Sequence, residues 1–290
     1  MNLQLVQNLL SSLSVPSRLD EIHLDEIQRS IFIKRDDLIH PVISGNKWRK
    51  LEGHIKQFNS KSAKGIVSMG GVYSNHLHAL AYVCSVLKIP CDLLIYGWHD
   101  NQWTPTLKDA LNWSANLYPI SRSDAQNLRD QNFDCIQDKL KTAYWIPEGG
   151  GGEAGMIGMK HLVDELPQNF DREDHLIVCP CGTGTTLHGL IKHSRHIQIV
   201  SLRNVKQTIY PMLNKDRFSW LPATESKSFG KITASTKQFV LEFKSNYGIE
   251  LDLIYTAPLM QAFLNSNLAT DYRQIYFIHT GGLQGNRIHL

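Results

Sequence analysis

The sequence reads Leu176-Ile177-Val178-Cys179-Pro180-Cys181-Gly182-Thr183-Gly184-Thr185-Thr186-Leu187-His188-Gly189 where a short apolar run meets a loop of glycines and threonines. An apolar run of this length, bounded by turn-forming residues, is typical of a strand buried on both faces. The residues that follow the loop continue as a helix. The stretch therefore predicts a strand, a tight loop and a helix, which is the unit from which parallel α/β sheets are built.

The same alternation of strand and helix recurs along most of the chain. Strands are predicted at Ile31–Lys34, Gly65–Ser68, Cys91–Tyr96, Asn116–Ile120, Ala143–Ile146, Leu176–Cys179, Gln198–Ser201, Leu253–Tyr255 and Ile275–His279. Helices are predicted at Arg49–Asn59, Ser74–Leu87, Thr106–Trp113, Met156–Leu166 and Lys237–Tyr247. We therefore expect an α/β fold with mostly parallel sheets and helices on both faces. No linker or repeat is visible, so any second domain is expected as an insertion.

The composition is that of an ordinary globular protein. The 290 residues are 42% hydrophobic and 20% charged, and 30 Lys and Arg against 27 Asp and Glu give a net charge of only +3. This balance, without a dense basic run, argues against nucleic acid or an anionic membrane as the partner. No apolar run is long enough to span a bilayer, and the N-terminus lacks the pattern of a signal peptide. The expected location is the cytoplasm.

The cysteines and histidines indicate neither a disulfide framework nor a metal centre. Five cysteines are an odd number and lie scattered along the chain. The pair Cys179 and Cys181 has the wrong spacing for a zinc knuckle, and the pair His76 and His78 has no accompanying ligands. We therefore expect no metal site.

The loop Gly182–Thr186 has the features of a phosphate site. Glycines let backbone N–H groups approach a ligand closely, threonine hydroxyls add donors, and a helix N-terminus favours an anion. The loop lacks the Gly-Lys-Ser/Thr ending of a nucleotide P-loop and the G-x-G-x-x-G order of a dinucleotide fold. The same letters also fit a tight strand–helix turn capped by a threonine.

A lysine follows a second turn. Lys47 stands in Ser44-Gly45-Asn46-Lys47-Trp48-Arg49-Lys50-Leu51, between a Ser-Gly-Asn turn and the start of a helix. A lysine held by backbone geometry can form a Schiff base with an aldehyde cofactor. The alternative is an ordinary solvated charge.

Other polar residues also stand where a strand is expected to end. Ser74, Asn75 and His76 open a helix, where they offer several donors to a carboxylate, although Ser74 also fits a simple N-cap. The run Gly149–Gly152 suits close approach to a ligand or a hinge. Tyr255 can be a core aromatic or reach a cleft with its hydroxyl, and Thr280 can cap the turn that follows it. In open α/β sheets, ligands bind where such ends converge.

Taken together, these residues fit pyridoxal phosphate (PLP) holding an amino acid. A lysine for an imine, a phosphate site, a carboxylate-binding helix start and a partner for the ring nitrogen are what this cofactor needs as an electron sink for a carbanion.

The chain resembles the family of 1-aminocyclopropane-1-carboxylate (ACC) deaminases and D-cysteine desulfhydrases, PLP enzymes of the tryptophan-synthase-β-like fold (fold type II). Matching segments run from Ile33-Lys34-Arg35-Asp36-Asp37 to His279-Thr280-Gly281-Gly282. The resemblance implies a two-domain fold, with residues 1–51 and 154–290 as a large PLP-binding domain and residues 52–153 as an inserted small domain. The cofactor would lie in the cleft between the domains. A homodimer is implied by the same analogy.

The resemblance also implies roles for individual residues. Lys47 would form the internal aldimine, and Asn75 would contact the ring's O3′. The phosphate would be bound by Gly182, Thr183, Gly184, Thr185 and Thr186. Ser74, Asn75, His76 and Tyr255 would contact the substrate, with Ser74 and Tyr255 also counted as catalytic.

One departure discriminates within the family. In ACC deaminases, the residue pair at the predicted strand end looks like Tyr-Glu, and the glutamate contacts the pyridine nitrogen. This chain has Tyr255-Thr256, as in D-cysteine desulfhydrases, which leaves Thr280 as the partner of the ring nitrogen. A hydroxyl does not hold that nitrogen protonated, so elimination of a good β-leaving group is favoured over opening of a cyclopropane ring. Ala257-Pro258 replaces the Gly-Lys that often follows the tyrosine pair.

The sequence therefore predicts a PLP-dependent lyase that performs α,β-elimination on a small D-amino acid, best D-cysteine. The alternatives are ACC deamination on the same scaffold and a PLP-binding protein without turnover. A cofactor-free binding module, in which the glycines only make turns, is a third reading.

Overall fold

The computed structural model describes residues 2–99, 102–202, 216–222 and 232–290. The chain divides into two compact units. Unit 1 comprises Met1–Ser14 and Lys47–Gly158, and unit 2 comprises Val15–Asn46 and Met159–Leu290. Each unit is an α/β layer structure built on its own sheet.

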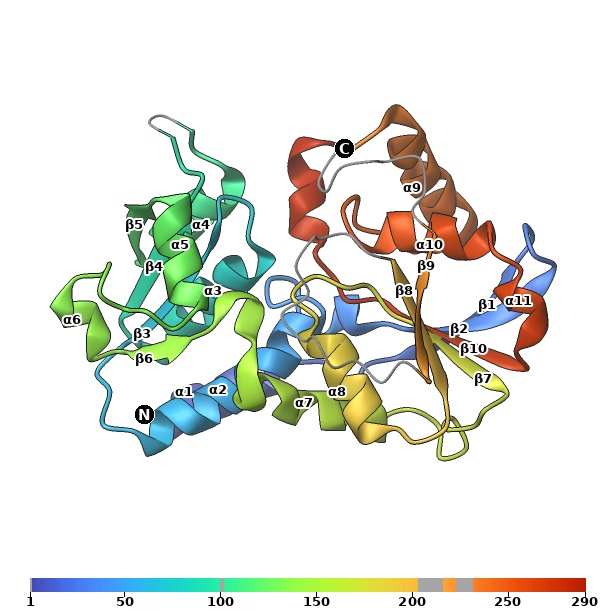
Figure 1. Ribbon diagram of the computed structural model, residues 1–290, viewed down its shortest axis with the longest axis horizontal. Coiled ribbons are helices and arrows are strands. Elements are labelled where there is room, and N and C mark those ends of the chain that lie inside the picture. The colour runs from blue at the N-terminus through green and yellow to red at the C-terminus, as the bar shows by residue number, and fades with distance from the viewer. Residues whose placement is uncertain (1, 100–101, 203–215, 223–231) are drawn as a thin grey trace. The chain divides into compact units, whose positions relative to one another are not determined.

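Unit 1 has a four-stranded parallel sheet in the order β5-β4-β3-β6. Its elements are α1 (Leu3–Ser11), α2 (Asn46–Ser60), β3 (Ile66–Gly71), α3 (Asn75–Leu87), β4 (Cys91–Tyr96), α4 (Pro105–Asn112), β5 (Asn116–Ile120), α5 (Arg122–Arg129), α6 (Asp138–Lys141), β6 (Tyr144–Ile146), the 3-10 helix η2 (Glu148–Gly150) and the first part of α7 (Gly152–Asp164). Figure 1 shows α5 beside this sheet. Ala125 and Leu128 of α5 pack in one cluster with the strand residues Val67, Met69 and Leu94. The central strands β3 and β4 are mostly buried, as in parallel sheets generally, whereas the edge strand β5 is partly exposed.

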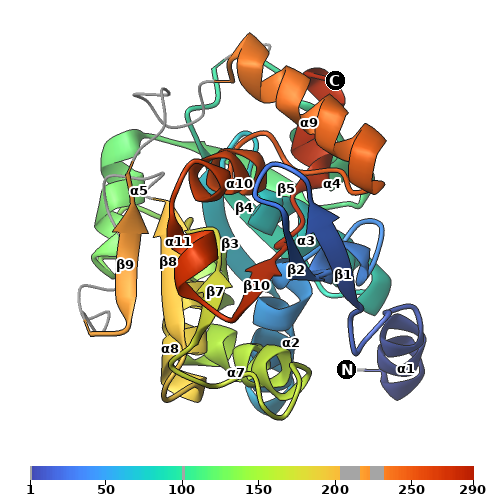
Figure 2. The ribbon, with the colours of Figure 1, turned by 90° about the vertical axis from the view of Figure 1, so that its right-hand side faces the viewer.

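Unit 2 has a six-stranded sheet in the order β1-β2-β10-β7-β8-β9, which Figure 2 shows strand by strand. Its elements are β1 (Leu19–Leu24), β2 (Arg29–Lys34), the 3-10 helix η1 (Asp36–Leu38), β7 (His175–Val178), α8 (Thr185–His193), β8 (Gln198–Leu202), β9 (Phe218–Leu221), α9 (Ala234–Tyr247), α10 (Thr256–Leu264), α11 (Leu268–Asp271), β10 (Gln274–Ile278) and the 3-10 helix η3 (Leu283–Ile288). The β1–β2 pair is antiparallel and the other pairs are parallel.

Two apolar layers hold the sheet of unit 2. On one face, strand residues such as Leu176 and Val178 pack against Phe243 of α9 and Met260 of α10. On the other, residues such as Ile177 join α7 and α8. Figure 1 shows α9 and α10 on one side of this sheet and α7 and α8 on the other. The predicted α/β class, with mostly parallel sheets and helices on both faces, is confirmed.

The predicted strand Leu253–Tyr255 is wrong. These residues form a turn that leads into α10, and the reason is the side chain of Asp252. Its carboxylate accepts hydrogen bonds from the backbone N–H groups of Ile254 (3.0 Å), Tyr255 (2.8 Å) and Thr256 (2.8 Å). An aspartate that captures successive N–H groups offers the backbone an alternative to a strand ladder. Tyr255 therefore stands at a helix start and not at a strand end.

We predict that Asp252→Ala lowers the free energy of unfolding by about 3 kcal/mol, because three N–H groups and the Thr256 hydroxyl lose a buried charged acceptor. Asp252→Asn keeps one oxygen and should lose less. Urea unfolding followed by tryptophan fluorescence measures both. Equal stability of wild type and Asp252→Ala would contradict this account of the turn.

Candidate functional site

Lys47 is the second residue of α2, and its side chain is half-buried. The chain that enters this helix is fixed at three successive residues of unit 2. The Ser44 hydroxyl donates to Asp37 O (3.0 Å), Gly45 N donates to Asp36 O (2.8 Å), and Asn46 N donates to Thr280 O (3.2 Å). The start of the lysine helix is thus held by backbone geometry, as the Ser-Gly-Asn turn predicted.

Two glycines let this turn and the Thr280 turn approach closely. Gly45 has φ +71°, and a Cβ there would lie 1.8 Å from Thr280 O. Gly281 has φ +70°, and a Cβ there would lie 2.4 Å from the Ser44 hydroxyl oxygen. Both positions demand a left-handed backbone and exclude any side chain. The contact between the two segments therefore depends on glycine at both.

The loop Gly182–Thr186 leads from β7 into α8. Gly184 is the N-cap at φ 89°, and no side chain caps the helix. Thr185 and Thr186 are buried, and Asn46 Nδ2 donates to the Thr186 hydroxyl (2.9 Å). A threonine-capped turn is therefore not what the chain forms. The first N–H groups of a helix have no acceptor within it, so this end of α8 suits an anion.

Tyr255 lies against the same loop. A Cβ on Gly182 would sit 3.5 Å from Tyr255 Cε1 and 3.7 Å from its hydroxyl oxygen. The next residue, Thr256, is fully buried, and its hydroxyl donates to Asp252 Oδ2 (2.7 Å) while accepting from Asp252 N (2.7 Å). The hydroxyl of Thr256 is thus committed inside unit 2.

Thr280 follows β10 and is 6% exposed. It is positioned by its neighbour His279, whose Nε2–H donates to Glu250 O (2.7 Å) and whose Nδ1 accepts from Gly281 N (3.2 Å). Among the described residues, none forms a hydrogen bond with the Thr280 hydroxyl. Unit 2 therefore brings together Asn46, the loop at 182–186, Tyr255 and Thr280.

Unit 1 carries the remaining predicted residues. Ser74 caps α3 by accepting from Leu77 N (3.3 Å), and a Cβ on Gly70 would lie 2.7 Å from the Ser74 hydroxyl oxygen. Asn75 and His76 are the first two residues of the helix. Their backbone N–H groups belong to the first turn, which has no acceptor inside the helix. The side chain of His76 points toward β3, where its Nε2 lies 2.9 Å from the Ser68 hydroxyl oxygen.

The glycine run forms a turn attached to α2. The Lys50 ammonium donates to Gly149 O (3.2 Å), and His54 Nε2 lies 3.0 Å from Gly151 O. The backbone φ is positive at Gly149, Gly150 and Gly152. Lys50 and His54 lie on α2 after Lys47, and we did not predict either from the sequence. Their helical spacing from Lys47, at three and seven residues, was the available signal.

Glu148 anchors the turn from its other side. It accepts from the Tyr96 hydroxyl (2.5 Å) and from Arg129 Nε (2.8 Å). Burial and the adjacent Glu148 carboxylate raise the pKa of Tyr96 to about 12, so the phenol stays protonated as a donor. None of these three residues was predicted, because they come together only in the tertiary structure.

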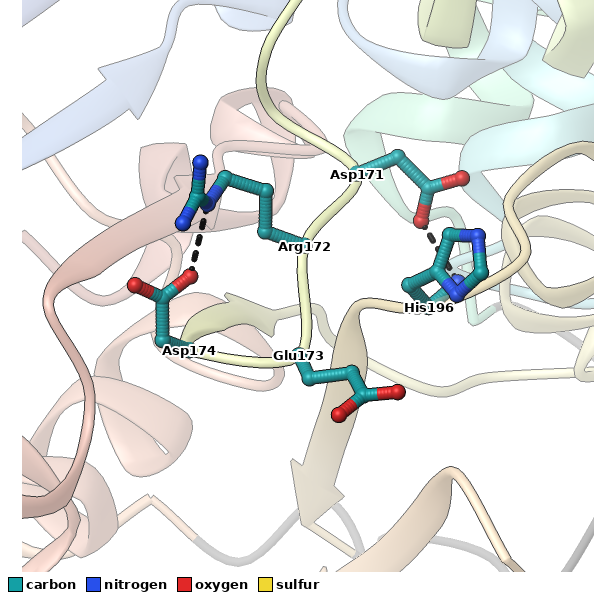
Figure 3. Close-up of a pocket in the computed structure, with 5 residues that line it drawn as sticks. All are labelled: Asp171, Arg172, Glu173, Asp174 and His196. Atoms are coloured by element: carbon teal, nitrogen blue, oxygen red, sulfur yellow. Dashed lines mark hydrogen bonds and ion pairs between the residues drawn. The ribbon is translucent and has the colours of Figure 1, made fainter.

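A hollow on the surface of unit 2 is not part of this site. It is lined by Asp171, Arg172, Glu173, Asp174 and His196 (Figure 3). Asp171 accepts from the backbone N–H groups of Arg195, His196 and Ile197, and Asp174 pairs with Arg172 (2.9 Å). These contacts stabilise the loop that leads into β8.

In the described parts of the chain, no helix is long and apolar enough to cross a membrane.

Residues 17–212 match the profile of the family described as pyridoxal-phosphate dependent enzyme. The match covers more than half of the chain, which therefore belongs to this family, and its cofactor is pyridoxal phosphate. The residues fit that group: the start of the Lys47 helix is held in place, the α8 N-terminus has no side-chain cap, and the Thr280 hydroxyl lies in unit 2 with α8.

Similar proteins carry two related names. A mitochondrial bifunctional D-cysteine desulfhydrase/1-aminocyclopropane-1-carboxylate deaminase of Arabidopsis thaliana is 25% identical, over 88% of this chain and 73% of its own. A D-cysteine desulfhydrase of Serratia proteamaculans is 23% identical, over 89% and 88%. A solved structure of an ACC deaminase homologue superposes with a TM-score of 0.72 at 22% identity, covering 99% of this chain and 97% of that one. The last likeness shows the fold.

We predict that Gly45→Ala lowers the free energy of unfolding by more than about 2 kcal/mol, because the new methyl overlaps Thr280 O in a strained backbone. Gly248→Ala is the matched control, since Gly248 has φ +67° but no atom within 4 Å of a Cβ. That control should lose only about 1 kcal/mol. Equal losses in urea unfolding would mean that the overlap with Thr280 has no role.

We also predict a pH dependence from His54. Burial lowers the pKa of this imidazole to about 4, from an ordinary value of 6.5. Between these values the unfolded chain binds more protons, so the free energy of unfolding falls as pH is lowered through that window. His54→Gln should flatten this fall, with urea midpoints compared between pH 7.5 and 4.5. An unchanged slope in the variant would contradict the assignment.

Proposed function

We propose that this member of the pyridoxal-phosphate-dependent enzyme family is a lyase that performs α,β-elimination on a small D-amino acid. D-Cysteine is the proposed substrate, and pyruvate, sulfide and ammonia are the products. A homodimer in the cytoplasm is the proposed state of the enzyme.

One observation carries this proposal. Asn46, the residue before Lys47, donates through its backbone to Thr280 O (3.2 Å) and through its side chain to the Thr186 hydroxyl (2.9 Å). The residue at the base of the lysine helix is thereby bonded to the phosphate loop and to the segment of the ring-nitrogen partner. Asn46 therefore supports the three segments to which the proposal assigns cofactor contacts.

Each site residue has a proposed task. Lys47 would hold the cofactor covalently, and as a free amine it takes the Cα proton of the substrate as general base. The phosphate is held by Gly182, Thr183, Gly184, Thr185 and Thr186. When bound, pyridoxal phosphate supplies an electron sink for the Cα carbanion.

The remaining residues orient the ring and the substrate. Thr280 would offer its hydroxyl to the ring nitrogen, and Asn75 would contact the ring's O3′. The substrate carboxylate is held by Ser74 together with the first N–H groups of α3, those of Asn75 and His76. Tyr255 lies against the substrate, where its hydroxyl assists the departure of the β-substituent.

The choice of elimination rests on Thr256. In the ACC deaminase pattern the residue at this position is a glutamate. Here it is Thr256, which is fully buried and whose hydroxyl is bonded to Asp252. Thr280 is then the hydroxyl left for the ring nitrogen. A hydroxyl does not keep that nitrogen protonated as a carboxylate does, which supports loss of a thiolate over opening of a cyclopropane ring.

ACC deamination is the second candidate. The bifunctional name of the Arabidopsis relative favours it, since one scaffold there carries both activities. A PLP-binding protein without turnover is the third. It would show the absorbance of bound cofactor but release no oxo acid from any amino acid.

We predict that Lys47→Ala lowers sulfide release from D-cysteine by at least about 10³-fold, because both the covalent anchor and the general base are lost. Wild-type protein should show the visible absorbance of a lysine-bound cofactor, and the variant should not. Sulfide and pyruvate release are measured from D-cysteine and L-cysteine, and ammonia release from ACC. Lys56→Ala is the control, an exposed lysine on the same helix paired with Glu52.

Three results would count against the proposal. A stable adduct between the cofactor and another lysine in the Lys47→Ala variant would show that Lys47 is not the covalent anchor. A larger kcat/KM with ACC than with D-cysteine would favour the second candidate. Absorbance without product from any of the three substrates would favour the third.

A further inference from the structure

His76 is a buried imidazole with one nitrogen that has no hydrogen-bond partner. The residue is 2% exposed, and its Nε2 lies 2.9 Å from the Ser68 hydroxyl oxygen. Its Nδ1 forms no hydrogen bond within the described structure. Buried polar atoms are nearly always satisfied, so an orphaned one at a functional site calls for an explanation.

The surroundings fix which ring nitrogen carries the proton. The Ser68 hydroxyl donates to Ile146 O (2.8 Å), and a carbonyl oxygen can only accept. Ser68 has one proton to give, so its oxygen must accept from His76. The Nε2 of His76 is therefore protonated, and Nδ1 presents a lone pair.

The lone pair lies on the side of the glycine turn. A Cβ on Gly150 would sit 3.4 Å from both Nδ1 and Cε1 of His76, and 3.1 Å from Lys50 Cβ. Gly150 also has φ +73°. A glycine here keeps the Nδ1 edge of the ring uncrowded, which gives the run at 149–152 a purpose beyond turning the chain.

Three titratable groups, all on α2, affect the pKa of His76: those of His54, Lys50 and Lys47. The other elements next to the ring, β3 and η2, contribute uncharged residues, Ser68 and Gly150. His54 is held between Gly151 O and the Tyr144 hydroxyl, and Lys50 donates to Gly149 O. Lys47 differs from both, because in the proposed reaction its amine gains a proton and so a new N–H donor.

We infer that His76 Nδ1 accepts a hydrogen bond from the Lys47 ammonium that forms when this lysine takes the Cα proton of the substrate. The inference rests on the proposed function. The proton moves from Cα to Lys47 Nζ and stays there, and the electron pair of the C–H bond remains with the substrate. His76 gains no proton and acts as a positioning residue for Lys47.

Burial supports this role. It lowers the pKa of His76 well below its ordinary value, and the positive charges of Lys50 and Lys47, with that of His54 at acid pH where it is protonated, lower it further. A protonated imidazole would repel the Lys47 ammonium and would have no lone pair for it. A neutral acceptor in a buried site forms a charge-assisted hydrogen bond, which is stronger than a neutral one.

The test compares His76→Leu with His76→Gln, which retains an acceptor oxygen. We expect His76→Leu to lower kcat for D-cysteine by about 10- to 100-fold with KM changed less than about threefold, and to raise the isotope effect of Cα-deuterated substrate. His76→Gln should recover about tenfold of the loss. The acceptor stabilises the ammonium and raises the pKa of Lys47, so the ascending limb of the kcat profile should move to lower pH in His76→Leu.

His78→Leu is the matched control. His78 lies two residues later on α3, is equally buried, and bonds Asp109 (2.9 Å). It should lose stability without a change in isotope effect or pH profile. If His76→Leu behaves like His78→Leu, the inference is overturned while the proposed function stands. If wild-type protein turns over no amino acid, the proposed function fails and the inference fails with it.

A second readout needs no turnover. ¹⁵N spectra of histidine-labelled protein, with and without cofactor, report the protonation of each ring nitrogen. We expect His76 as the neutral Nε2–H tautomer from pH 6 to 9, and Ser68→Ala to abolish that preference. A protonated ring or an Nδ1–H tautomer in wild type would overturn the inference, because neither form presents the required lone pair.

Discussion

The hydrogen bond from Asn46 N to Thr280 O is the contact on which the candidate site depends. It joins two backbone segments more than 200 residues apart, and it forms only because Gly45 and Gly281 lack side chains. A backbone contact of this kind uses no side-chain atoms. Lys47 is the residue that follows Asn46, so this contact fixes the backbone from which the lysine helix starts.

A second frame supports the lysine helix from within unit 1. Lys50 and His54 bond carbonyls of the glycine turn, and Glu148 ties that turn to Tyr96 and Arg129. Burial holds His54 neutral and Tyr96 protonated at ordinary pH, so neither changes its hydrogen-bonding role there. The polar groups that support α2 are thus mostly donors and acceptors of fixed character, which suits the proposed role of Lys47 as a residue that changes its protonation.

Prediction from sequence succeeded where strands are mostly buried and followed by turn-forming residues, as at β4 before Gly97 and β7 before Pro180. It missed β1, an edge strand rich in charged residues, because a strand with one neighbour needs no apolar faces. It failed at Leu253–Tyr255, where the apolar letters of a strand were overruled by one aspartate. Local pattern cannot reveal which acceptor a backbone N–H will find.

The sequence by itself determined the α/β class, the glycine-bounded loops and the residue types that pyridoxal phosphate requires. These properties are local, since they follow from periodicity and from turn chemistry within a few residues. Only the tertiary structure decided that Asn46 bonds both Thr186 and Thr280, that Thr256 turns inward to Asp252, and that His76 presents a lone pair on the side of Gly150. The contacts of Asn46 and His76 depend on groups far apart in the chain, which only packing within each unit brings together. The turn at Thr256 depends on which N–H groups the Asp252 carboxylate accepts in the folded chain.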